Sequence, residues 1–383
     1  MKKEYIFIVQ VTRQLSVDII NNFVINGSSV ELITGNVEYN YAALDKVVKV
    51  KLFNKYNQSS FSGRLRSGLL FSLRCFCYLI FKSGKKELIL VSTPPFILYV
   101  GWLLKKLRRQ KYHLIIWDLY PDVIVNMNVV EEKRFIMRLW GNLNRHCFKH
   151  ASTIFTLGKH LSNAIKKYTD VDPVIVPNWV DTSFIKPMDR AENIFAKKYN
   201  LTNEVVVMYS GNFGLTHDIE SVVYAAKELL SNKKIKFVLI GEGSKIQWIE
   251  NFVKENSLSN VLVLPYQDRS MLPYSLTSAD ISIVTLSKGA ESVSVPSKTY
   301  YSLASGSAII ALAAKESELG VLIKNYNCGY VMENSSPNEI AQVILDLSGN
   351  SEKLNALKSN SRNASMDFSP ENAKEYYLNI IKD

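Results

Sequence analysis

Short apolar runs that alternate with longer helical segments constrain the fold of this chain more than any other feature. Each run is rich in Val, Ile and Leu and has the length of a buried strand, and amphipathic or apolar segments separate most of them. The runs of the first half are EYIFIVQ, VELITG, VVKVKLF, ELILVST, HLIIWD and STIFTLG, and those of the second half are NEVVVMYSG, KFVLIGEG, NVLVLP, ADISIVTL, SAIIALA and CGYVM. This alternation predicts α/β architecture, with parallel sheets covered by helices.

Because the pattern occurs in both halves of a 383-residue chain, we expect two doubly wound domains. The first is predicted at residues 1–180 and the second at 181–368, with a helix at 369–383 that crosses back to the first domain. The joint falls near VPNWVDTSFIKPMDR, where two prolines and several polar residues interrupt the periodicity. Ligands of such folds bind outside the carboxyl ends of the strands, which predicts a site in a central cleft that the two domains face.

Charge is distributed unevenly between the two halves. Residues 1–180 carry 26 Lys and Arg against 12 Asp and Glu, whereas residues 181–383 carry 20 against 23. Between Lys51 and Lys111 there are 13 basic residues and a single acid, Glu87. The first half is therefore expected to face an anionic partner.

Cysteine usage and apolar length indicate a cytoplasmic protein. The four cysteines lie at 75, 77, 147 and 328 without metal-ligand spacing, which favours structural thiols in a reducing compartment. The longest apolar stretch, GLLFSLRCFCYLIF, is shorter than a spanning helix needs and contains Arg74. The first residues are too short in apolar length for a signal peptide.

Glycine-rich segments follow two strands of the second half. In SGNFGLTHD, small residues at 210, 211 and 214 allow a ligand to approach the backbone, and a following helix would direct its amides at a phosphate. In GEGSK, Gly241 and Gly243 precede Lys245, a cation that opposes the helix dipole. The alternatives are an ordinary tight turn and a solvated surface lysine.

The segment AESVSVPSKTYY follows the strand run ADISIVTL. Pro296 suits the first position of a helix, which places Ser297 and Lys298 in its first turn. Glu291 can accept hydrogen bonds from hydroxyls, and Ser297 and Lys298 can bind phosphate oxygens, so a polyol with a diphosphate would satisfy all three. The alternative is a surface ion pair between Glu291 and Lys298.

These motifs, together with PNWVD and LPYQDRSMLPYSLTSADISIV, occur in the order found in the retaining glycosyltransferases of family 4. The chain most resembles the bacterial surface-polysaccharide branch that includes L-fucosamine transferases. The resemblance extends over essentially the whole chain and is strongest at residues 174–311. It implies a GT-B fold, in which two Rossmann-like domains face a cleft and the second domain binds most of a nucleotide-sugar.

The resemblance also implies roles for individual residues. Gly211, Asn212, Gly241, Gly243 and Lys245 would lie near the donor phosphates. Tyr266 and Gln267 would contact the base, and Glu291 would bind hydroxyls of the donor sugar. WDLYPD resembles a loop that faces the cleft, with Asp118 and Asp122 near the donor sugar or the acceptor.

The chain departs from the family pattern at three positions. A second Glu usually follows the first by eight residues and holds the ribose, but Thr299 or Tyr301 occupies that place here. The loop after SGNFG lacks the usual Arg and Lys, for which Lys245 and Lys298 are the expected substitutes. QVTRQLSV lacks the glycine pair of many relatives, which leaves acceptor contacts there open.

Transfer of a sugar from a diphosphate builds negative charge on the leaving group, which fixed cations and helix N-termini stabilise without a metal. No acidic DxD-type motif or metal-ligand cluster stands out in the sequence, so we expect a metal-independent transferase without a cofactor. Its expected donor is a UDP-sugar, and Glu291, Lys298 and Asp118 are its predicted catalytic residues. No protein base is nominated, because the leaving phosphate itself can take the acceptor proton.

A basic surface in the first half suggests the acceptor. In the predicted helix 131–150, Ile136, Leu139, Trp140, Leu143 and Cys147 share one face, and Arg134, Arg138, Arg145 and Lys149 lie on the opposite face. In residues 64–82, Phe71 and Tyr78 are predicted to be exposed beside Arg64, Arg74 and Lys82. Basic residues mixed with aromatics suit an anionic bilayer, on the inner face of a bacterial plasma membrane. The alternative is a buried apolar helix with solvated cations, and nucleic acid is a weaker alternative because no recognition motif accompanies the charge.

The function predicted from the sequence is transfer of an amino-deoxy hexose to a lipid-diphosphate-linked saccharide in O-antigen or capsule synthesis. Two alternatives remain open. A GT-B-fold nucleotide-sugar 2-epimerase would bind the same donor but needs acidic and His residues around the sugar. A non-catalytic partner subunit would explain the missing second Glu, whereas Glu291, Lys298 and the glycine loops oppose it.

Overall fold

The computed structural model describes residues 3–38, 42–57, 61–126, 135–214, 217–286 and 296–382. The chain divides into two compact units, the first formed by residues 1–178 with 370–383 and the second by residues 179–369. Each of the twelve apolar runs contains a strand, and every strand pair in both sheets is parallel.

The first unit contains a seven-stranded sheet among its described residues. In spatial order its strands are β5 (Lys49–Leu52), β3 (Ser29–Thr34), β1 (Glu4–Ile8), β6 (Glu87–Val91), β7 (Tyr112–Ile116), β8 (Ile154–Thr156) and β9 (Val174–Ile175). A separate short pair joins β2 (Val11–Thr12) to β4 (Asn36–Val37). Strand β7 is buried along its whole length, as a central strand covered on both faces must be.

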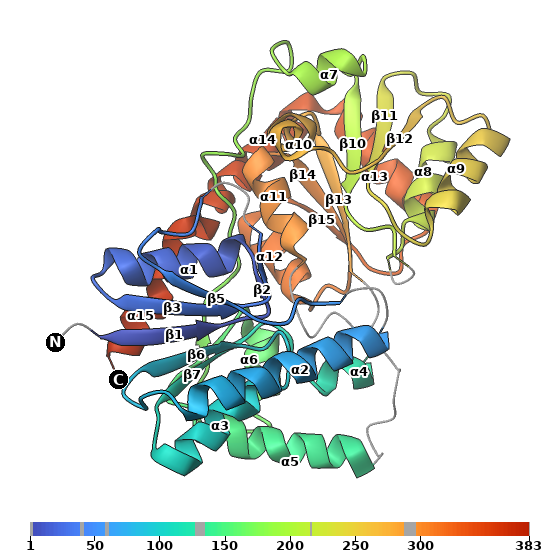
Figure 1. The fold of residues 1–383 in the computed structure, drawn as a ribbon. Helices are drawn as coiled ribbons and strands as arrows, with labels where there is room; N and C mark the ends of the chain where they lie inside the picture. The colour runs from blue at the N-terminus through green and yellow to red at the C-terminus, as the bar shows by residue number, and fades with distance from the viewer. Residues whose placement is uncertain are drawn as a thin grey trace. The chain divides into compact units, whose positions relative to one another are not determined.

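Helices cover both faces of this sheet (Figure 1). On one face α1 (Gln14–Ile25) packs against α15 (Ala373–Ile381), which brings the end of the chain back to the first unit. On the other face α2 (Phe61–Ile80) packs on α3 (Ile97–Arg108), and α3 packs on α5 (Phe135–Lys149). The shorter helices are α4 (Asp122–Asn126) and α6 (Lys159–Ile165). None of the described helices combines the length and the apolar character needed to cross a membrane.

The second unit contains a six-stranded sheet among its described residues. Its order is β12 (Val261–Leu264), β11 (Ile235–Ile240), β10 (Val205–Ser210), β13 (Ile281–Thr285), β14 (Ala308–Leu312) and β15 (Gly329–Met332). Alternate residues of β10 enter two different cores, with Val207 and Tyr209 on one face and Val206 and Met208 on the other. Burial on both faces explains why the strands of this sheet correspond to continuous apolar runs in the sequence.

The helices of the second unit divide between the two cores. The core that contains Val207 includes side chains of α8 (Glu220–Glu228), α9 (Ile246–Glu255) and α13 (Pro337–Gly349). The core that contains Val206 includes side chains of α7 (Ile194–Lys198), α10 (Leu272–Thr277), α11 (Ser297–Ser305) and α12 (Glu318–Tyr326). Helix α14 (Ser351–Ser365) contributes to both.

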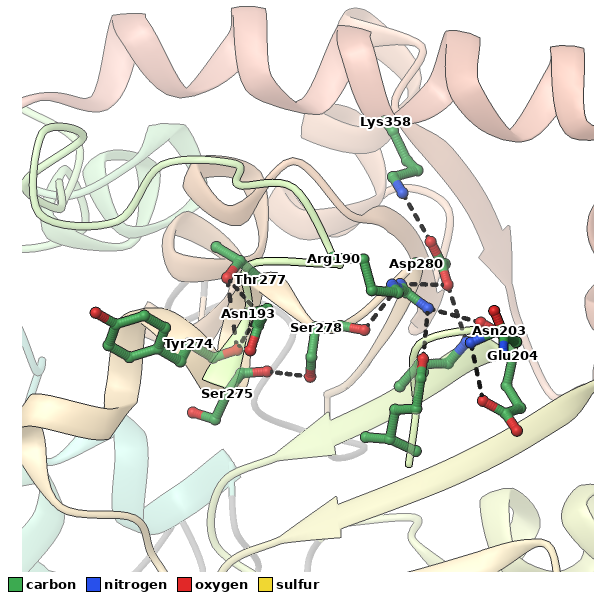
Figure 2. A network of polar contacts seen from close by, with 12 residues as sticks. Arg190, Asn193, Asn203, Glu204, Tyr274, Ser275, Thr277, Ser278, Asp280 and Lys358 are labelled. Carbon is green, nitrogen blue, oxygen red and sulfur yellow. Dashed lines mark hydrogen bonds and ion pairs between the residues drawn. The ribbon is translucent and has the colours of Figure 1, made fainter. Parts of the chain in front are cut away.

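An ionic network anchors the amino-terminal edge of this sheet (Figure 2). The Asp280 carboxylate binds the Arg190 guanidinium at 2.6 Å and the Lys358 amine at 2.7 Å, and it accepts the backbone N–H of Val206 at 3.0 Å. Arg190 also donates to the carbonyls of Leu201, Glu204 and Ser278. These bonds fix the segment before β10 to the start of β13 and to α14, at the edge opposite the carboxyl ends where ligands bind.

Candidate active site

The glycine loops after β10 and β11 lie against each other at the carboxyl edge of the second sheet. The N–H of Phe213 donates to the carbonyl of Glu242 at 2.8 Å, and the N–H of Lys245 donates to the carbonyl of Phe213 at 3.0 Å. A Cβ at Gly241, whose φ is +154°, would lie 1.9 Å from the carbonyl oxygen of Gly211. Close backbone packing therefore requires glycine here, whether or not a ligand binds.

Lys298 points from the start of α11 to this loop pair. A Cβ built at Gly211 would lie 3.9 Å from the Lys298 amine, which sits 4.1 Å above the ring centre of Tyr209. The amine is buried and has no hydrogen-bond partner among the described residues. Burial lowers the pKa of this amine to about 7. A buried cation without a counter-ion is costly, and an anion next to it would remove that cost.

The start of α11 adds a second attraction for an anion. Pro296 is the N-cap of the helix, not its first residue as the sequence predicted, and it provides no side-chain cap. Ser297 and Lys298 occupy the first turn, as predicted. The N–H of Thr299 donates to the carbonyl of Pro296 at 2.9 Å, which leaves the amides of Ser297 and Lys298 for a ligand or for water. A neighbouring pocket of about 180 Å³ is lined in part by Ser210, Ser297, Lys298 and Tyr301.

Lys245 differs from Lys298 in its surroundings. It is the N-cap residue of α9, and its amine binds the carboxylate of Glu220 and the carbonyl of His217, both at 2.7 Å. This ion pair with α8 explains a lysine at a helix start without any bound diphosphate. The structure thus favours the structural interpretation of Lys245 over the phosphate-binding one.

The other predicted donor residues lie in varied settings. Asn212 is exposed, and its side-chain oxygen would lie 2.6 Å from a Cβ at Gly243. Tyr266, about half exposed, lies close to Glu242, and Gln267 donates to the carbonyl of Pro265 at 2.8 Å. Thr299 is fully buried and has no surface for a donor to contact. Glu291 lies outside the described residues.

In the first unit Asp118 and Asp122 have different roles. Asp118 follows β7, and its N–H and that of Trp117 donate to the Ser92 hydroxyl at 3.1 and 3.0 Å. Its carboxylate keeps contact with solvent, yet surrounding atoms desolvate it and raise its pKa. Asp122 begins α4 and accepts the hydroxyl of Tyr168 at 2.6 Å, a contact that holds it in place.

The buried face of α5 is not the predicted apolar face, with which it shares only Cys147. Its buried residues are Met137, Gly141, Asn144, Cys147 and Phe148, while Ile136 and Leu139 are exposed. Asn144 is buried because it donates to the carbonyl of Tyr120 at 2.6 Å and accepts from Tyr99.

The predicted basic residues of α5 remain on the outside. Arg138 and Arg145 line a pocket of about 410 Å³ together with Lys167 and Asp122. Lys149 is exposed at the end of the helix, and Arg134 lies outside the described residues.

Two features of the structure were not predicted from the sequence. Tyr209, the last buried aromatic of β10, forms the cation–π contact with Lys298. Phe96, Trp140 and Tyr120 form an aromatic cluster beside Asp118 in the first unit. A strand-end tyrosine before a glycine loop is a signal that could have identified the first, but the second depends on tertiary packing.

Comparison with known proteins agrees with this architecture. Residues 190–364 match the family model described as glycosyl transferases group 1. The glycosyltransferase WbjE of Pseudomonas aeruginosa is 25% identical over 309 residues, which are 77% of this chain and 76% of WbjE. WcaI of Escherichia coli (strain K12), named for colanic acid biosynthesis, is 26% identical over 230 residues, which are 58% of this chain and 56% of WcaI.

Solved structures show the same fold over the full length. Sucrose-phosphate synthase from Thermosynechococcus elongatus has a TM-score of 0.76 at 15% identity, over 100% of this chain and 98% of that one. Anabaena HepE, solved with UDP and glucose, has a TM-score of 0.71 at 13% identity over 99% of each chain. Residues 190–364 are therefore similar to the group 1 glycosyltransferases, and the chain has the GT-B fold.

Proposed function

We propose that this glycosyltransferase moves an amino-deoxy hexose from a UDP-sugar to a lipid-diphosphate-linked saccharide during O-antigen or capsule assembly. The observation that carries the donor part is the buried amine of Lys298, which has no hydrogen-bond partner within the described part of the chain and lies at the glycine loop after β10. A diphosphate supplies the anion that this position lacks. Structures of HepE with UDP support a nucleotide-sugar donor, and the name of WcaI, which refers to colanic acid biosynthesis, supports a surface polysaccharide.

The chemistry requires stabilisation of a leaving group. The bond between the anomeric carbon and the diphosphate oxygen breaks, and the acceptor hydroxyl oxygen bonds to that carbon. The acceptor proton passes to the departing diphosphate, in a same-face reaction that retains configuration. Lys298 and the first amides of α11 would stabilise the charge that grows on the diphosphate, which makes a metal unnecessary in this proposal.

The acceptor part rests on the outer surface of α2, α3 and α5, which we call the acid-free face. These three helices contain no Asp or Glu. The predicted aromatics are not its exposed residues, since Phe71 is fully buried and the Tyr78 hydroxyl binds Glu31. Its exposed apolar residues are instead Leu65, Leu69, Leu70, Leu73, Ile80, Leu103, Leu107, Phe135, Ile136 and Leu139.

Exposed apolar side chains among cations suit an anionic bilayer better than water alone. Arg64, Arg66, Arg74, Lys106, Arg138, Arg145 and Lys149 are exposed on the same helices. Leucines can enter the interfacial region while arginines and lysines bind lipid headgroups. We therefore propose that the acid-free face rests on the inner leaflet of a bacterial plasma membrane, where lipid-linked acceptors are found.

A panel of nucleotide-sugars tests this function. Thermal shift identifies the donor, and incubation of that donor with lipid-linked saccharides then detects transfer. We expect stabilisation by UDP-sugars and a product one sugar longer. Interconversion of the donor without an acceptor would instead identify an epimerase, and donor binding without any product would identify a non-catalytic subunit.

A further inference from the structure

The first unit contains an apolar pocket of about 270 Å³ that the donor chemistry does not use. It lies between α2, the loop after β6, the segment after β7 and Trp140 of α5. The body of the pocket is formed by Leu65, Pro94, Pro95, Phe96, Val123, Ile124 and Trp140. Such a lining favours hydrocarbon, because it offers few partners to the hydroxyls of a sugar.

The aromatic rings of this pocket stack on one another. Trp140 stacks on Phe96 with ring centres 5.5 Å apart and on Tyr120 at 6.2 Å, with interplanar angles of 19° and 12°. Their near-parallel arrangement uses ring faces that a pyranose would need for stacking. The aromatic cluster therefore lines the pocket but does not offer a free ring face for a sugar to stack on.

Polar groups gather at one side of the pocket. Asp118, Tyr56 and Arg64 all act electrostatically on the Tyr120 hydroxyl, and all four residues line the pocket. Arg64 is exposed and forms no ion pair in the described part of the chain. A ligand that fits must therefore be amphipathic, with an apolar segment and an anionic group next to it.

The pocket is continuous with the acid-free face through Leu65. This side chain lines the pocket and is 42% exposed, and Leu69 and Leu73 follow at four-residue intervals with 55% and 57% exposure. Residues four apart lie on one side of a helix, so the three leucines form an apolar track along α2. A chain that leaves a bilayer beneath this face would meet apolar surface all the way to the pocket.

We propose that this pocket holds the hydrocarbon units nearest the phosphate of a prenyl-phosphate lipid, with the phosphate at Arg64 and the acceptor end directed to Asp118. The inference rests on the proposed lipid-linked acceptor and adds the place where its lipid is gripped. Binding there would fix the distance between the lipid and the reacting sugar, because the anchor and Asp118 belong to one rigid pocket.

Titration with farnesyl phosphate, a short prenyl phosphate, tests the proposal by calorimetry in detergent-free buffer below its micelle concentration. Val123→Phe should fill the pocket and weaken binding by about tenfold or more, because the apolar burial of the chain is lost. Leu69→Ser, on the same track but outside the pocket, is the matched control and should change affinity by less than about twofold. Arg64→Gln should reduce the affinity for farnesyl phosphate to that for farnesol.

The outcomes separate this proposal from the proposed function. Equal binding by the wild type and Val123→Phe, or equally tight binding of inorganic phosphate, would overturn the pocket assignment. UDP titration of each variant reports whether the second unit is intact. UDP-sugar binding and elongation of a lipid-linked saccharide, together with farnesyl phosphate binding that neither Val123→Phe nor Arg64→Gln changes, would refute the pocket proposal. The transferase function would then stand. If no nucleotide-sugar binds, the transferase function itself fails.

Discussion

Replacement of Lys298 by Met should make the protein more stable and the donor site weaker. The pKa of the buried amine falls from 10.5 to about 7, and one pKa unit corresponds to about 1.4 kcal/mol. At neutral pH the penalty for this group is therefore at most roughly 4 kcal/mol. Loss of the cation–π contact with Tyr209 offsets about 0.5–2 kcal/mol of that gain. We expect a net gain of about 1–3 kcal/mol in the free energy of unfolding.

The pH dependence has a definite sign. Between about pH 7 and 10.5 the unfolded chain binds a proton at Lys298 that the folded chain lacks. The contribution of this group to stability therefore rises with pH across that window. The stability difference between Lys298→Met and the wild type should be largest below pH 7 and should shrink toward pH 10. Urea unfolding of the wild type and of Lys298→Met at pH 7 and pH 9.5 measures the stability difference and its decrease with pH.

Binding of UDP should couple to the same proton. At pH 8 the free amine is mostly neutral, and a bound diphosphate favours its charged form, so the wild type should take up a proton on binding. Calorimetry in buffers of different ionisation enthalpy detects that uptake. Lys298→Met should abolish this proton uptake and lower the affinity for UDP by about tenfold or more, with a smaller effect on the affinity for UMP.

Lys245→Met provides the matched control, because Lys245 also begins a helix beside the glycine loops but is paired with Glu220. It should lose stability by about 1 kcal/mol or less and keep proton-coupled binding. An unchanged affinity of Lys298→Met for UDP, or an equal loss for UDP and UMP, would refute the phosphate role. A loss of stability in Lys298→Met would refute the electrostatic reasoning.

Three further predictions concern other parts of the chain. Glu291→Gln should lower turnover by about 10²–10³-fold at unchanged thermal stability, and near wild-type turnover would exclude a role in the transition state. Asp280→Asn should lower the free energy of unfolding by about 3–5 kcal/mol in urea, because two cations lose their counter-ion; a change below about 1 kcal/mol would contradict this. Leu69→Ser, Leu73→Ser and Arg74→Gln together should release the protein from anionic vesicles, as should added salt, whereas unchanged sedimentation with vesicles would leave the acid-free face solvated.

The fold could be predicted from the sequence because buried parallel strands appear in it as short continuous apolar runs. Each predicted run contains a strand, since most strands of both sheets are covered on both faces and their residues are mostly apolar. The exception is the edge strand β5, which is exposed and alternates Lys with Val and Leu. The pair β2 and β4 and the edge strand β9 were not predicted. Two residues are too few for a periodic signal, and their pairing is set by the neighbouring chain.

The surface of α5 shows where local reasoning fails. A buried apolar face that contains residues 136 and 139 was the alternative to the membrane-facing helix, yet Gly141 and Asn144 are buried and Ile136 and Leu139 are exposed. A small residue allows close approach, and a polar one is buried once a neighbouring carbonyl accepts its hydrogen bond. Neither condition can be read from the helix alone, because both depend on Tyr120 and the elements that pack against α5.

The two lysines of the second unit show what a functional cation requires. Both follow a strand and begin a helix, and no feature of the local sequence distinguishes their predicted roles. The fold supplies Glu220 to Lys245 and supplies only the ring of Tyr209 to Lys298 among the described residues. A paired lysine stabilises the fold and has little attraction left for a ligand, whereas an unpaired one costs stability until an anion arrives. Interaction energy that is released only when charge grows on the leaving diphosphate lowers the barrier to transfer, and we propose that Lys298 provides it.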